Sequence, residues 1–117
     1  MQKSGLEQNK NEMLYCIANA EFSKVKHLRR TLKRQWNKEM LIERNKAYSN
    51  IVNNLEKYIQ TQPNIYDGKL IRIYRLLSES YFGLKNKVKA LEYIEKAINL
   101  SEGDEFHINY KLYIQNN

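Results

Sequence analysis

The chain has 117 residues, of which 42% are hydrophobic, and a formal net charge of +7. This length is enough for one domain that buries roughly two-thirds of its unfolded surface, and the hydrophobic content argues against a disordered chain. Four glycines and one proline leave few positions for tight turns. The composition therefore favours a few long helices over many short strands.

The only cysteine, Cys16, cannot form an internal disulfide. It lies in the apolar run 13–20, where a small buried hydrophobic residue is the expected role. The run is too short to span a bilayer, and the acidic residues Glu7 and Glu12 make it a poor signal peptide. We therefore expect an intracellular, cytoplasmic protein that folds as a single helical domain over residues 1–117.

A first helix is predicted from Asn11 to Phe22. Ser23 is a candidate break, although Lys26 is not the Glu or Gln that would complete a capping box with it. The sequence leaves open whether this helix stops near Asn19 or continues. Its apolar positions at helical spacing are Met13, Leu14, Ile17, Ala18 and Phe22.

Residues 24–46 hold a basic helix in this interpretation. Residues 24–38 contain seven Lys or Arg and no Asp or Glu, so this stretch accounts for the whole net charge. Like charges at i, i+4 disfavour a helix, so either the apolar stripe compensates or the face has an anionic partner. The apolar stripe, expected in the core, is Val25, Leu28, Leu32, Trp36 and Met40. The candidate binding residues are Lys26, Arg29, Arg30, Lys33, Arg34 and Lys38.

The pattern continues as an amphipathic helix that ends near Thr61, because Pro63 cannot continue it. Residues 64–68 read as a loop, with Asp67 a candidate N-cap for the next helix. Asp104 is expected to cap a last helix that covers the open end of the stack. The covering side chains are Phe106, Tyr110 and either Tyr113 or Ile114.

Residues 70–103 form the clearest pattern, an αα-hairpin with alanines where its two helices meet. Small residues such as Ala90 and Ala97 allow helix axes to approach closely. Residues 71–104 resemble one tetratricopeptide repeat, a helix–turn–helix unit of about 34 residues. The matching positions are Tyr74, Leu77, Ser78, Tyr81, Ala90, Ile94 and Ala97, and the departures are Lys85 for a glycine, Lys87 for an aromatic residue and Glu102 for a proline.

The resemblance implies an all-α fold of about five helices, either an antiparallel helix-hairpin bundle or a short TPR-like α-solenoid. In that family, the first helix of each repeat lines a groove that binds a protein or peptide. Carried onto this chain, the groove positions are Arg72, Arg75, Glu79 and Phe82. The two arginines suit a carboxylate or phosphate, and Phe82 suits an apolar anchor.

No catalytic, metal or cofactor motif is evident. His27 and His107 lack the spaced partners of a helical metal site, and no glycine-rich phosphate loop exists. We therefore expect a non-enzymatic interaction module without a cofactor, which engages an acidic protein or peptide and is able to self-associate. The alternative is a nucleic-acid or nucleoprotein-binding protein that uses residues 24–38 with little sequence specificity. A membrane surface is disfavoured, because Trp36 is assigned to the core.

Overall fold

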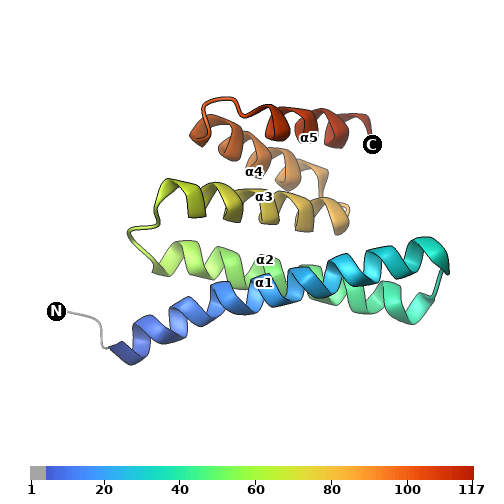
Figure 1. The fold of residues 1–117 in the computed structure, drawn as a ribbon, viewed down its shortest axis with the longest axis horizontal. Coiled ribbons are helices and arrows are strands. Elements are labelled where there is room, and N and C mark those ends of the chain that lie inside the picture. Colours follow the sequence, from blue (N-terminus) through green and yellow to red (C-terminus); the bar gives the residue numbers. More distant parts are fainter. Residues whose placement is uncertain (1–4) are drawn as a thin grey trace. The chain divides into compact units, whose positions relative to one another are not determined.

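A computed structural model describes the backbone of residues 5–117 and the side chains of residues 10–117. This part of the chain contains five helices and no strand, which confirms the predicted all-α fold (Figure 1). The helices are α1 (Gly5–Arg34), α2 (Lys38–Thr61), α3 (Asp67–Gly83), α4 (Lys87–Leu100) and α5 (Glu105–Asn116). The chain divides into two compact units, one ending at Pro63 and one beginning at Asn64. Each is described by itself.

The first unit is an antiparallel hairpin of α1 and α2. Near the start of α1, Glu12 accepts a hydrogen bond of 2.7 Å from the Tyr58 hydroxyl, which lies near the end of α2. Further along α1, the Lys24 amino group is 3.0 Å from the Glu43 carboxylate near the start of α2. The hydrogen bond and the charge of Glu43 both raise the pKa of Lys24.

Two expectations for the basic segment are wrong. The helix α1 ends at Arg34, so residues 24–46 do not form one helix. It also passes through Ser23 without a break, which decides the alternative that the sequence leaves open. Asn37 begins a new helix instead, because its side chain accepts the Met40 N–H at 3.1 Å and so caps α2. Trp36 therefore lies in the turn between the helices, where 68% of its surface is exposed. Because Trp36 is exposed, its position gives no reason to exclude a membrane surface.

The burial of Cys16 and the capping role of Asp67 are also wrong predictions. Cys16 is exposed, because α1 turns Ala18 and Val25 to the core and leaves Met13 and Ile17 on the solvent side. The apolar residues of the run 13–20 therefore cover more of the helix surface than the face of α1 that packs against α2. Asp67 is not the N-cap of α3; it lies in the first turn, and no side chain caps this helix.

The second unit is the predicted hairpin with α5 packed on it. The Tyr93 ring of α4 lies 6.0 Å from Tyr74 and 5.8 Å from Tyr81, both on α3. Ser78 lies between these two tyrosines in the sequence of α3, and its buried hydroxyl donates a 2.7 Å hydrogen bond to the Ala90 carbonyl. The core of α4 and α5 is the cluster of Ala90, Ile94, Ala97 and Ile114, none of which is exposed. Of the two candidates named for α5, Ile114 is therefore the covering residue, and Tyr113 is half exposed.

Left-handed residues close both turns of this unit. Lys85, after α3, has φ 64°, and Glu102, after α4, has φ 58°. Beyond each of them an N–H reaches back five residues to a helix carbonyl, from Asn86 to Tyr81 at 2.8 Å and from Gly103 to Ile98 at 2.9 Å. This is the pattern of a Schellman C-cap, in which the left-handed position normally favours glycine.

Candidate functional site

Four cationic side chains lie together on the solvent side of α1. They are spaced at i, i+3, i+4 and i+7, which places them on one helix face. They surround a shallow hollow of about 220 Å³ and all are exposed. We call this surface the basic face: Lys26, Arg29, Arg30 and Lys33.

The charges of the basic face are not neutralised within the described part of the chain, where none of its four residues forms an ion pair with a carboxylate. Its internal contacts are weak. Arg30 Nε donates to the Lys26 carbonyl at 3.4 Å, and Lys26 Nζ lies 5.2 Å from the centre of the Phe22 ring. Lys24, just before the face, is the cation that pairs with Glu43. The four cations of the basic face therefore have no carboxylate partner among the described residues.

The remaining two predicted cations lie at the turn after the basic face. Arg34 is the last residue of α1, where a positive charge also favours the negative end of the helix dipole. Lys38 is the first residue of α2, so it does not share the helix of the other five. Between them in the sequence lies Trp36, which the apolar period alone assigns to the core. The signal for its exposure is Asn37 followed by Glu39, a common start of a helix.

The predicted groove residues of α3 are divided between solvent and internal contacts. Arg72 is exposed, but Arg75 lies over the Phe106 ring of α5, with its guanidinium carbon 5.6 Å from the ring centre. Phe82 meets the Tyr113 ring of α5 edge-on at 5.7 Å and packs against the core cluster. Glu79, which lies between Arg75 and Phe82 in the sequence, is half-buried. The expected apolar anchor is thus already engaged within this unit.

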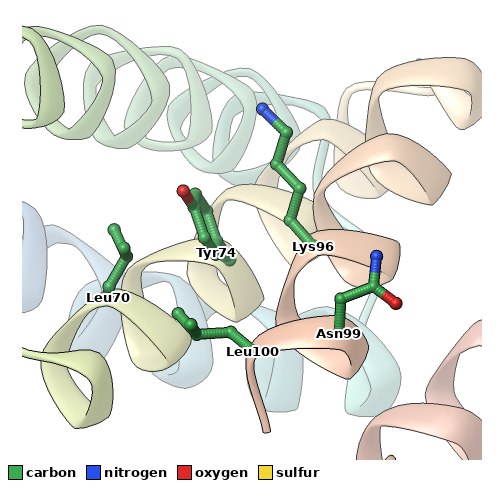
Figure 2. Close-up of a pocket in the computed structure, with 5 residues that line it drawn as sticks. All are labelled: Leu70, Tyr74, Lys96, Asn99 and Leu100. Atoms are coloured by element: carbon green, nitrogen blue, oxygen red, sulfur yellow. The ribbon is translucent and has the colours of Figure 1, made fainter. Parts of the chain in front are cut away.

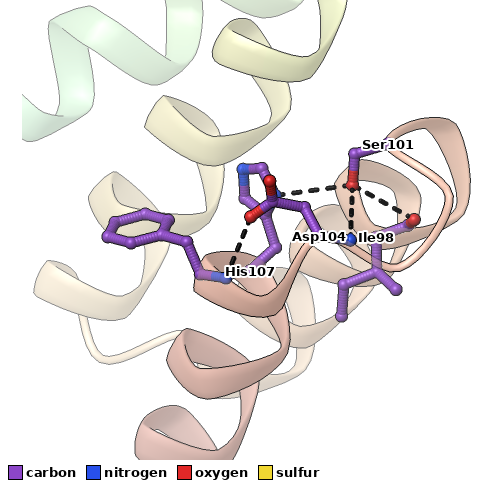
Figure 3. A network of polar contacts seen from close by, with 5 residues as sticks. Ile98, Ser101, Asp104 and His107 are labelled. Atoms are coloured by element: carbon purple, nitrogen blue, oxygen red, sulfur yellow. Dashed lines mark hydrogen bonds and ion pairs between the residues drawn. The ribbon is translucent and has the colours of Figure 1, made fainter.

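A polar network surrounds His107 at the start of α5 (Figure 3). Its Nδ1 lies 3.4 Å from Asp104 Oδ1 and 3.5 Å from Ser101 Oγ. Burial lowers the pKa of His107 more than Asp104 raises it, and Arg75 lowers it further. The Asp104 carboxylate thus lies beside a ring whose burial opposes its protonation.

The residue types of this network resemble those of a hydrolase, but the arrangement does not. A Ser-His-Asp triad needs the serine and the carboxylate on opposite ring nitrogens. Here Ser101 and Asp104 share Nδ1, while Nε2 is buried and has no hydrogen-bond partner among the described residues. Ser101 in turn donates to the Ile98 carbonyl and accepts the Asp104 N–H, both at 3.3 Å. The network therefore secures the turn between α4 and α5.

A second hollow, of about 400 Å³, lies between the start of α3 and the end of α4 (Figure 2). The Lys96 amino group lies 5.8 Å from the centre of the Tyr74 ring and 5.3 Å from that of Tyr93. The only charged group in the lining thus already contacts aromatic rings. The lining residues are Leu70, Tyr74, Lys96, Asn99 and Leu100.

Within the described residues, no group of three or more His, Cys, Asp or Glu side chains has an arrangement that could hold a metal ion. None of the described helices combines the length and apolar character needed to cross a bilayer. Comparisons with protein-family models and with curated proteins give no match for this chain. The tetratricopeptide resemblance therefore stays a prediction from the residues quoted above.

Proposed function

We propose that this chain is a non-catalytic binding module that takes an acidic macromolecule on the basic face of α1. One observation carries the proposal: four cations surround one hollow and have no carboxylate partner among the described residues. Since like charges on one helix face are mutually unfavourable, a polyanion that bridges them removes a cost already present in the free protein.

The charge distribution of the whole chain supports the same interaction. Residues 24–38 carry seven of the twenty Lys and Arg, and the other thirteen equal the thirteen Asp and Glu. A local excess of this kind attracts anions over a Debye length, about 8 Å at physiological salt. Binding should therefore weaken steeply as salt rises.

The α3 surface is a secondary element of this proposal. If the tetratricopeptide resemblance holds, Arg72 and the groove beside it take part of the same acidic partner. Arg75 and Phe82 contribute less there, because they already contact α5. The basic face, unlike this groove, consists of exposed side chains only.

The test compares two double variants with equal net charge. Arg30→Glu with Lys33→Glu reverses two of the four charges of the basic face, whereas Lys46→Glu with Lys57→Glu reverses two exposed lysines of α2. We expect the first variant to elute from heparin at much lower salt than the wild type and the control variant to elute nearly unchanged. Circular dichroism confirms that both remain helical.

Equal weakening in both variants would contradict the proposal, because it would show that binding follows net charge and not this surface. Absence of retention for the wild type at low salt would contradict it as well. An Arg72→Ala variant then measures whether the α3 surface contributes to the same binding.

A further inference from the structure

Trp36 is the chain's only tryptophan and stands exposed in the turn that follows the basic face. The turn is fixed at both ends. Gln35 donates its N–H to the Thr31 carbonyl at 2.9 Å, and Asn37 accepts the N–H groups of Met40 and Leu41 at 3.1 Å. The exposed indole therefore lies on a turn with an ordered backbone and not on a frayed helix end.

The residues that flank Trp36 in the sequence are polar, and three of them are cationic. Lys33 and Arg34 precede it and Lys38 follows it, and all three are exposed. Gln35, Asn37 and Glu39, its other close neighbours in sequence, are exposed too. An exposed aromatic ring at the end of a row of cations is the combination that binds single-stranded nucleic acid, in which phosphates follow the cations and a base stacks on the ring.

We propose that the acidic partner is a single-stranded nucleic acid, with its phosphates on the basic face and one base stacked on Trp36. This inference rests on the proposed function and names its partner. The helix from Lys26 to Arg34 rises about 12 Å, a length that a few nucleotides span. Specificity for base sequence is low, since stacking accepts any base.

The other anionic partners use this surface less completely. A duplex keeps its base faces stacked inside, so it contacts the cations and leaves the indole in water. An acidic peptide likewise needs only the cations. A membrane needs an apolar surface around the indole, whereas here exposed Gln35, Asn37 and Glu39 would have to enter the interface with it.

The single tryptophan makes the test direct, because emission excited at the long-wavelength edge of indole absorption, where the nine tyrosines absorb little, reports on Trp36 alone. The probes are a single-stranded oligothymidylate, a DNA duplex of the same length, polyglutamate, and vesicles containing phosphatidylserine. We expect the oligothymidylate to quench the emission to saturation. The duplex and polyglutamate bind, if at all, without comparable quenching.

Substitution separates stacking from charge. Trp36→Ala should weaken oligothymidylate binding about ten-fold, measured by anisotropy of a labelled oligonucleotide, and change duplex binding less than about two-fold. Trp36→Phe should recover part of the loss. Because the ring is exposed, both variants should keep the circular dichroism of the wild type.

Unchanged oligonucleotide affinity in Trp36→Ala, or a blue shift with vesicles and no quenching by oligothymidylate, would overturn the inference and leave the basic face in place. If instead the Arg30→Glu, Lys33→Glu variant keeps full affinity for every probe, the proposed function itself fails. The two failures are therefore distinguishable.

Discussion

Replacing Lys85 with glycine should stabilise the α3–α4 hairpin. Lys85 has φ 64°, a left-handed conformation in which the Cβ atom of any residue except glycine is crowded. Its side chain is exposed, so no buried packing is lost when the side chain is removed. The backbone hydrogen bonds of the turn, from Lys85 to Phe82 at 3.0 Å and from Asn86 to Tyr81 at 2.8 Å, do not depend on that side chain.

The magnitude follows from two opposing effects. A left-handed residue other than glycine costs about 1–2 kcal/mol relative to the right-handed helix. Glycine removes that strain, but its greater conformational freedom in the unfolded chain lowers the free energy of unfolding by about 0.5–1 kcal/mol. The net gain in the free energy of unfolding should be about 0.5–1 kcal/mol, which raises Tm by a few degrees.

Urea unfolding of the wild type, Lys85→Gly and Lys85→Ala measures this gain. Alanine removes the lysine side chain but keeps the Cβ atom, so its midpoint should stay close to that of the wild type. A glycine variant no more stable than the alanine variant would refute the reasoning, because it would show that Lys85 is not strained in the folded chain.

Two further predictions concern buried polar groups. Ser78→Ala should lower the free energy of unfolding by about 1 kcal/mol, measured in urea, since it removes the buried 2.7 Å hydrogen bond to the Ala90 carbonyl; no loss would mean that this bond contributes nothing. Because the pKa of His107 is lowered on folding, the unfolded chain takes up a proton that the folded chain resists, so stability should fall as pH drops below about 6.5 and level off below the folded-state pKa. In His107→Gln, the urea midpoint should depend less on pH below about pH 6.5 than it does in the wild type, and an unchanged pH dependence would assign it to other groups.

Local signals predicted the second unit well. The period of apolar residues and the alanines placed the α3–α4 hairpin, and Asp104 caps α5 through its side chain as the sequence predicted. The Asn86 side chain caps α4 in the same way. These features depend on contacts between residues close in the chain, which a sequence records directly. The left-handed geometry of Lys85 is not evident from the lysine itself, although the tetratricopeptide pattern places a glycine at this position.

The first unit shows what the sequence alone determined: amphipathic helices of which the second ends near Thr61, a concentration of cations over residues 24–38, and more apolar side chains than one helix face can bury. It could not determine which of those apolar side chains would be buried. Met13, Cys16, Ile17 and Trp36 suited a core as well as Ala18 and Val25 did, and only the packing of α2 against α1 decided between them. A helix buries the face that its neighbour covers, and that neighbour is chosen by the tertiary fold.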